Sequence, residues 1–275
     1  MASAPTPVVR RGFGVTSRRD TWWLTPLLTL LGLSTFIIYS TWAAFQAASY
    51  HFDGGGADYL SPFYSPVLFD AAGVESGHAW FGAAPSWWPG FLPYSPAFLI
   101  LWAPAGFRLT CYYYRGAYYK AFWADPPSCA VGEPRKSYLG EHSLPLILQN
   151  VHRYFLYVAM LFLLVLAYDA WRAMWFSTGD GGGREFGVGI GTLVLTANVV
   201  FLSGYTLGCH SLRHLVGGSL NWLSKAPCRR KAYGCVSCLN RGHMRWAWCS
   251  LFWVGFSDVY VRLCASGVWT DWRIF

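Results

Sequence analysis

Seven thiol and imidazole side chains carry most of the chemistry that the sequence offers. They are Cys111, Cys129, His152, Cys209, His210, His214 and His243. Among them, His210 and His214 are four residues apart, and on a helix this spacing places both imidazoles on one face, about one turn apart. One metal ion can then bind both nitrogens. The alternative is a pair of interfacial histidines that contact lipid headgroups or a partner protein.

Two metal cofactors suit a mixture of thiols and imidazoles. Haem b in a helix bundle needs two axial histidines from two helices at similar depth, and His152 with His210 or His214 would supply them. A Rieske-type [2Fe–2S] cluster needs two cysteines on one iron and two histidines on the other. Because haem needs no thiols, the mixture favours the cluster. Its first-choice ligands are Cys111, Cys129, His210 and His214, with Cys209, His152 and His243 as alternates.

A second group of possible ligands follows the first in the sequence. Cys228, Cys235, Cys238 and His243 have a loose resemblance to a zinc site with three cysteines and one histidine. The same segment carries Arg229, Arg230 and Lys231. A basic segment that docks on a soluble partner is the simpler interpretation.

The composition places these side chains in a membrane protein. Hydrophobic residues make up 54 % of the 275 residues and charged residues only 12 %, about half the usual share in a soluble domain. This balance excludes a disordered chain and a small disulfide scaffold, and it argues against an ordinary soluble enzyme. Aromatic residues reach 19 %, which suits belts at the membrane interface. We therefore expect an all-α membrane protein that binds no nucleic acid.

Apolar runs predict five transmembrane helices that together form one helical domain over residues 22–275. We expect a cytoplasmic tail at residues 1–21 and an aromatic-rich outer cap at residues 49–93. Most Lys and Arg residues then fall in inside segments, as the positive-inside rule requires, and the seven thiol and imidazole side chains lie near inner helix ends. The expected spans are residues 22–48, 96–123, 144–176, 186–215 and 245–268.

Four ionisable residues fall inside these expected spans. Asp169 and Arg172 are three residues apart, and Asp258 and Arg262 are four residues apart. At these spacings each acid can neutralise its neighbouring cation on a helix. The alternative is a metal-regulated membrane transporter in which the four charges line a pathway.

Five segments together resemble the membrane-anchor subunit, cytochrome b-like, of bacterial succinate dehydrogenase or fumarate reductase, which is respiratory complex II. The likeness covers roughly residues 90–270. The segments are FRLTCYYYRGAYY at 107–119, PPSCAV at 126–131, NVHRYF at 150–155, CHSLRH at 209–214 and LNRGHM at 239–244.

This resemblance implies a place in the respiratory chain and the tricarboxylic acid cycle. A flavoprotein subunit with FAD would oxidise succinate, so the chain itself would hold no succinate site. An iron–sulfur subunit with further clusters would relay electrons, and the anchor would pass them to quinone near the inner face of a bacterial plasma membrane. Haem b is common in such anchors. The expected quinone contacts are His152, Arg153, Tyr154 and Trp246, because quinone needs an aromatic slot with a few polar partners.

Overall fold

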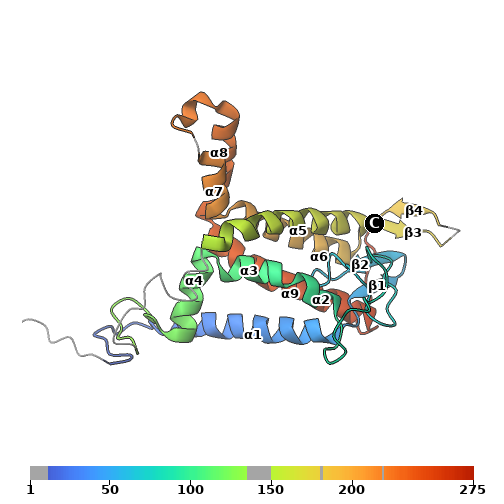
Figure 1. Ribbon diagram of the computed structural model, residues 1–275, viewed down its shortest axis with the longest axis horizontal. Helices are drawn as coiled ribbons and strands as arrows, with labels where there is room; N and C mark the ends of the chain where they lie inside the picture. Colours follow the sequence, from blue (N-terminus) through green and yellow to red (C-terminus); the bar gives the residue numbers. More distant parts are fainter. Residues whose placement is uncertain (1–11, 135–149, 180–181, 219) are drawn as a thin grey trace, which may run out of the picture. The chain divides into compact units, whose positions relative to one another are not determined.

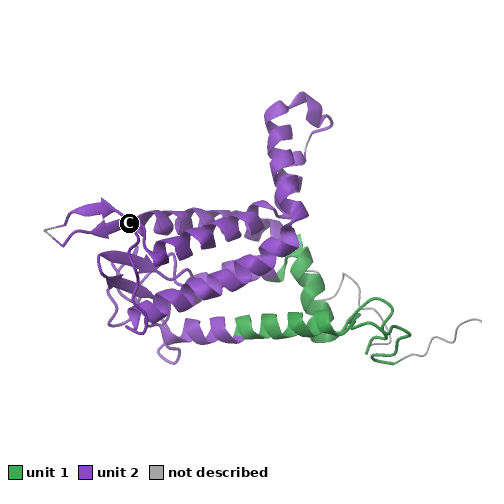
Figure 2. Cartoon of the chain, turned by 180° about the vertical axis from the view of Figure 1, so that it is seen from behind, with its two compact units in different colours: residues 1–37, 109–150 green, residues 38–108, 151–275 purple. Residues whose placement is uncertain are grey.

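The computed structural model describes residues 12–134, 150–179, 182–218 and 220–275, which are mostly helical. The chain divides into two compact units (Figure 2). The first unit contains residues 1–37 and 109–150, and the second contains residues 38–108 and 151–275. The helix α1, Leu24–Gln46, continues from the first unit into the second.

Three helices are long and apolar enough to cross a membrane. They are α1, α5 (His152–Arg172) and α6 (Ile190–Leu207). Large side chains on α5 stay exposed, among them Leu161 at 57 % and Leu164 at 69 %, as expected for a helix face that contacts lipid rather than protein. These three helices confirm the membrane character that the composition predicts.

A bundle of helices forms the core of the second unit. The helix α6 packs against both α5 and α9, His243–Ala265, and Figure 1 shows the three helices side by side. With 23 residues, α9 has the length of a membrane helix. It carries Arg245, Asp258 and Arg262, and α5 likewise carries three charged residues, whereas α6 carries none.

The expected span at residues 96–123 is not one continuous helix. The structure has α2 (Pro96–Ile100), α3 (Trp102–Leu109), α4 (Tyr112–Tyr118) and a π-helix, Tyr119–Trp123. Pro104 has no N–H, so it cannot bond the carbonyl of Ile100 and continue α2. At Cys111 the backbone is extended, with ψ 130°, which separates α3 from α4. Apolar composition alone did not reveal these breaks.

Two other expected spans end differently from the prediction. Residues 144–149 of the third lie outside the described part, and α5 begins at His152. After α5 the chain forms β3 (Trp175–Ser177), which pairs antiparallel with β4 (Arg184–Phe186). The fourth expected span contains two helices, α6 and α7 (His210–Gly217), because the backbone at Cys209 is extended.

Another α-helix lies between α7 and α9. After a 3-10 turn at Leu223–Lys225, α8 covers Pro227–Arg241, and it packs against α7. Figure 1 shows α7 and α8 projecting together from the end of the bundle. We call these two helices the arm. The cysteines Cys228, Cys235 and Cys238 are therefore exposed side chains of a helix.

Between α1 and α2, the segment expected as an outer cap is folded around a hairpin. Strands β1 (His51–Gly54) and β2 (Ala57–Leu60) pair antiparallel. Gly55 and Gly56 join them with φ of 60° and 82°, the backbone that a two-residue hairpin turn needs. The ring of Tyr64 stacks on that of Tyr50 at 4.3 Å, and its hydroxyl donates to the Ala43 carbonyl of α1 at 2.6 Å.

Candidate functional site

A thiol and an imidazole meet in the interior of the second unit. His152, the first residue of α5, places Nε2 at 3.1 Å from Sγ of Cys209. Cys209 lies between α6 and α7. His152 is 7 % exposed and Cys209 is 1 % exposed, so the pair is shielded from solvent and from lipid.

The break between α6 and α7 positions Cys209. A Cβ atom at Gly208 would lie 2.6 Å from the Gly204 carbonyl oxygen and 3.1 Å from the backbone of Leu239. Only glycine permits this close approach of α8 to the end of α6. The Asn240 side-chain amide donates to the Gly208 carbonyl at 2.8 Å, which satisfies a helix end that would otherwise lack a partner.

Aromatic rings enclose the two histidines of this region. Phe107 of α3 stacks on the His152 ring with centroids 4.6 Å apart and planes 4° apart. Tyr205 of α6 meets the edge of Phe107 at 5.4 Å and stacks on His243 at 5.0 Å. Gly106 allows α3 to approach α5, because a Cβ atom there would lie 2.3 Å from the ring of Phe155 on α5. We call His152, Cys209, Phe107, Tyr205 and His243 the buried cluster.

One cation lies against the buried cluster. The Arg108 guanidinium is 4.7 Å from the centroid of the Tyr205 ring. Its Nη2 donates to Ser250 Oγ at 3.0 Å, and its Nη1 donates to the Ala247 carbonyl at 3.3 Å. These contacts fix a positive charge beside Tyr205, one member of the buried cluster.

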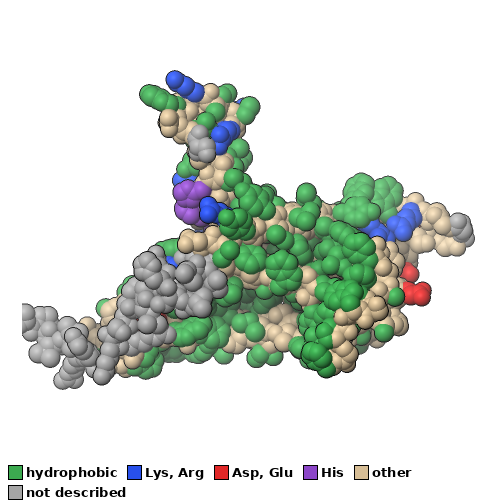
Figure 3. Space-filling view, in the orientation of Figure 1, with side chains coloured by type: hydrophobic (Ala, Val, Ile, Leu, Met, Phe, Trp, Pro, Cys, Tyr) green, Lys and Arg blue, Asp and Glu red, His purple; other side chains and the backbone are tan. Residues whose placement is uncertain are grey.

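The first-choice ligands are divided between the two units. In the first unit, Cys111 is buried and Cys129 is exposed. In the second unit, His210 and His214 lie on one face of α7, with their Nε2 atoms 2.9 Å apart, as their spacing predicts. Both side chains are exposed, and Figure 3 shows histidine side chains at the surface of the arm. Partial burial, the neighbouring His214 and Arg213 lower the pKa of His210.

Two acidic residues lie inside helices, Asp169 on α5 and Asp258 on α9. Sequence spacing predicts the partner of Asp258 but not that of Asp169. Asp258 and Arg262 pair as expected, with Nε to Oδ2 at 3.3 Å. Arg172 instead bonds Oδ2 of Asp58 at 2.8 Å. The carboxylate of Asp169 accepts a hydrogen bond from Ser65. The expected contact between Asp169 and Arg172 is therefore replaced by contacts with the cap segment.

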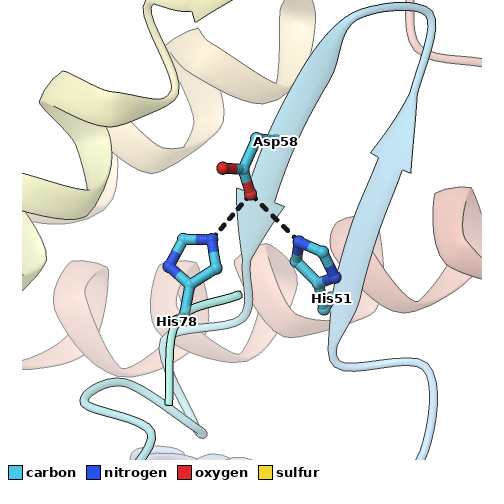
Figure 4. Close-up of side chains that lie close together, drawn as sticks. All are labelled: His51, Asp58 and His78. Carbon is cyan, nitrogen blue, oxygen red and sulfur yellow. Dashed lines mark hydrogen bonds and ion pairs between the residues drawn. The ribbon is translucent and has the colours of Figure 1, made fainter. Parts of the chain in front are cut away.

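A further group of possible ligands is not apparent from the sequence. His51, Asp58 and His78 bring one ligand atom each to within 4.8 Å of the others (Figure 4). In the part of the chain that the structure describes, no other group of three Cys, His, Asp or Glu residues meets in this way. The hairpin signal of three consecutive glycines could have placed His51 beside Asp58. Nothing in the sequence indicates His78.

Comparison with known proteins agrees with this architecture. The family model of the actinobacterial succinate dehydrogenase subunit SdhC matches residues 24–267. The chain belongs to this SdhC family. A solved structure, the Mycobacterium smegmatis Sdh1 complex in the apo form, contains a chain with 45 % sequence identity and a TM-score of 0.82, and the match covers 94 % of each chain. No curated protein matches the chain.

Membership in the SdhC family identifies the chain as a membrane-anchor subunit of succinate dehydrogenase. It is a multi-pass protein of the bacterial plasma membrane and associates with the other subunits of that enzyme. The resemblance found in the sequence is therefore confirmed.

The expected quinone contacts of this SdhC chain have different environments. His152 is buried, whereas Arg153 and Tyr154 on the same turn of α5 are exposed. The Arg153 guanidinium lies 5.3 Å from the centre of the Tyr154 ring. Trp246 is half-buried and packs on Gly204, where a Cβ atom would lie 2.5 Å from the indole ring.

Proposed function

We propose that this SdhC chain holds a Rieske-type [2Fe–2S] centre at the buried cluster and passes electrons from a docked iron–sulfur subunit to quinone. His152 and Cys209 are the ligands that we infer first, and His243 is the second imidazole. The single observation that carries the proposal is the contact of 3.1 Å between His152 Nε2 and Cys209 Sγ. Bound there, the cluster would supply one-electron transfer.

Burial favours these ligands over the first choice made from the sequence. Solvent exclusion protects thiolates that hold iron and lets nearby charges act strongly. Cys209 and His152 are buried, whereas His210, His214 and Cys129 are exposed. Cys111, which is 2 % exposed, and Cys129 belong to the first unit and remain candidates from the sequence alone. The choice of ligands can be tested residue by residue.

The environment of His152 resembles that of a metal ligand rather than an isolated core histidine. Metal-binding histidines commonly use a second hydrogen bond to a backbone carbonyl to fix the ring. His152 hydrogen-bonds to the backbone of Phe107, and the same residue stacks on the imidazole. The ring is therefore held in one orientation, with Nε2 toward the thiol.

The same contacts favour a compact cluster over haem b. An axial histidine needs open space for a porphyrin in front of its coordinating nitrogen. The Nε2 atom of His152 faces the Cys209 thiol, and Phe107 covers one face of the imidazole. A buried thiol in this region is available to an iron–sulfur site and is not used by a haem site.

Other residues of the chain assist electron transfer through their positions. Arg108 places a positive charge beside the buried cluster, which favours the more negative, reduced state of the site. Phe107 and Tyr205 exclude water. For the quinone we retain Arg153, Tyr154 and Trp246 as contacts, with His152 at the metal side of the slot.

The arm supplies a docking surface for the soluble subunits, which would carry FAD and further iron–sulfur clusters. Its helices and their connection expose a set of cations with no acidic residue among them in residues 209–243 of the sequence. Figure 3 shows Lys and Arg side chains along the arm. Such a field attracts an acidic partner surface. We place the arm and the N-terminus on the cytoplasmic side, and the succinate site on the partner flavoprotein. The exposed cations are Lys225, Arg230, Lys231 and Arg241.

Metal analysis of the purified complex tests the proposed cofactor. Iron, acid-labile sulfide and haem are measured in the wild-type complex and in Cys209→Ser. We expect the variant to lose two iron and two sulfide ions per complex, because one thiolate no longer binds. Cys249→Ser is the matched control, since Cys249 is an exposed thiol on α9. Unchanged iron and sulfide in Cys209→Ser would contradict the proposal, and so would one haem b per anchor.

A further inference from the structure

We propose that His51, Asp58 and His78 form a binding site for a divalent transition-metal cation of the Zn²⁺ class. The site is separate from the buried cluster. Arg172, which contacts it, is the last residue of α5, whereas His152 is the first, so the two sites lie about 30 Å apart along that helix. The inference does not depend on the proposed iron–sulfur centre.

The three ligand atoms already converge on one point. Nε2 of His51 lies 3.0 Å from Oδ1 of Asp58, and Nε2 of His78 lies 2.6 Å from the same oxygen. Figure 4 shows both imidazoles pointing to the same carboxylate oxygen, His78 from the left and His51 from the right. Zn²⁺ binds nitrogen and oxygen at about 2.0–2.2 Å, which sets ligand atoms roughly 3.3 Å apart in a tetrahedron. The two imidazole nitrogens would each move less than about 1 Å away from Oδ1 of Asp58, and all three ligand atoms already lie within 4.8 Å of one another.

Secondary structure and local hydrogen bonds hold these ligands. His51 and Asp58 lie on the paired strands β1 and β2. The backbone N–H of His78 donates to Ser76 Oγ at 3.2 Å, and this hydroxyl donates to Asp70 at 2.7 Å. A metal site with such fixed ligands loses little conformational entropy when the ion binds.

The donor set suits a borderline metal ion. Two neutral imidazoles and one carboxylate are common ligands of Zn²⁺ and of related transition metals, and they leave positions open for water. Arg172 donates to the second oxygen of Asp58 at 2.8 Å, which orients the carboxylate from its outer side. Burial alone would raise the pKa of Asp58, but the hydrogen bonds from His51 and His78 and the charge of Arg172 hold that pKa well below its usual value.

Arg172 is also a cation beside the site, and its charge would oppose a bound metal ion. Its Nη1 atom lies 3.3 Å from Nδ1 of His78. When Nε2 of His78 binds the metal, its proton leaves to solvent and the remaining ring proton sits on Nδ1, facing another donor. The guanidinium must then leave Nδ1 while it keeps Asp58.

A cavity beside the site gives Arg172 room to move. Its volume is about 260 Å³. His78, Arg172 and Asp169 supply its polar walls, while Leu164 and Val165 are among its apolar residues. The cavity thus reaches one metal ligand and the residue that must shift.

Cobalt titration of the purified, chelator-treated complex tests the site. Co²⁺ replaces Zn²⁺ and gives visible absorption bands whose intensity reports low coordination number. The double variant His210→Gln with His214→Gln serves as the background, because that exposed pair is a competing chelate. We expect one Co²⁺ per chain in the background, displaced by Zn²⁺, and a loss of affinity of at least about tenfold in His78→Gln and in Asp58→Asn, since each removes a ligand.

Two further variants keep the test decisive if His78→Gln fails to assemble. His51→Gln removes a ligand whose side chain is 13 % exposed, and it must also weaken binding. Arg172→Gln removes the opposing charge but keeps a side-chain amide that can donate to Asp58, so it must tighten binding. Equal Co²⁺ affinity in the background and in His51→Gln would overturn the site. So would an absence of binding in both the background and Arg172→Gln, because the three residues would then form only a charge network.

Discussion

Cys209 Sγ lies 3.1 Å from His152 Nε2. Cys209 follows the end of α6, and His152 is the first residue of α5. Different contacts hold each of the two residues. The extended backbone at Cys209 and the stacked ring of Phe107 fix the thiol and the imidazole separately. The contact therefore results from packing of three elements, and it distinguishes this pair from the exposed pair on α7.

Histidine substitutions separate the two candidate ligand sets. His152→Gln should reduce succinate:quinone activity at least tenfold, while electron transfer from succinate to an artificial acceptor stays unchanged, because the partner subunits are untouched. His210→Gln is the control of the same residue type, and it should keep most of the quinone activity. The reverse pattern, with His210→Gln inactive and His152→Gln active, would restore the exposed pair as ligands.

Close packing of α6 on α9 predicts an effect of a single added methyl group. In Gly204→Ala, the new Cβ atom would lie 2.5 Å from the Trp246 ring. Overpacking of this kind costs about 1–3 kcal/mol, more than the roughly 0.5–1 kcal/mol that alanine gains over glycine in a helix. Thermal unfolding of the purified complex should therefore begin at a lower temperature.

Gly234→Ala on α8 is the matched control for that variant. It also replaces a helical glycine, but nothing lies within 4 Å of its Cβ position. We expect an unchanged or slightly higher unfolding temperature. If both variants shifted the transition equally downward, the contact between Gly204 and Trp246 would not be the cause.

Asp258 joins α9 to α1 and to the cap segment. It is fully buried and accepts hydrogen bonds from Tyr39 at 2.6 Å and from Ser61, beside Arg262 at 3.3 Å. In Asp258→Asn an amide donor replaces an acceptor among three donors, and the Arg262 charge loses its counterion. Breaking a buried pair costs about 3–5 kcal/mol, so the variant should unfold at a much lower temperature or fail to assemble.

An exposed acid provides the comparison for Asp258. Asp20 pairs with Arg18 at the surface of the first unit, where solvent screens the interaction. Asp20→Asn should leave the unfolding temperature unchanged. A comparable loss in both variants would mean that burial does not decide the effect.

The charge network at Asp58 predicts a defined pH dependence. Its carboxyl has a lower pKa in the folded chain than in the unfolded chain, so the stabilisation is complete above the unfolded pKa of about 3.9 and is lost as the pH falls further. The difference in unfolding temperature between wild type and Asp58→Asn, measured with a chelator present, should persist from pH 7 to pH 5. It should shrink only below about pH 4. A difference that vanished between pH 7 and pH 5 would contradict this assignment.

Local patterns in the sequence predicted the parts of the structure that depend on local physics. Long apolar runs predict α1, α5 and α6, because a helix that crosses a membrane needs such a run. The spacing of His210 and His214 predicts that they share one face of a helix, because residues four apart lie about one turn apart. The expected span at residues 96–123 differed because hydropathy does not register the missing N–H of Pro104.

Contacts between distant segments could not be derived from spacing. Spacing pairs Arg172 with Asp169, three residues away, but Arg172 bonds Asp58, which is 114 residues away. His152 and Cys209 are only alternates on sequence grounds, because they are 57 positions apart and nothing in the sequence shows that they meet. Their contact depends on how α5 packs against α6, which only the folded structure reveals.

Pulsed EPR of the reduced complex measures the proposed ligands most directly, because it detects nitrogen nuclei that are bonded to a paramagnetic cluster. With ¹⁵N-labelled histidine, we expect strong hyperfine coupling to two histidine nitrogens, changed in His152→Gln and unaltered in His210→Gln. A reduced complex with no histidine coupling, or one in which His210→Gln alone removes it, would contradict the assignment of the centre to the buried cluster.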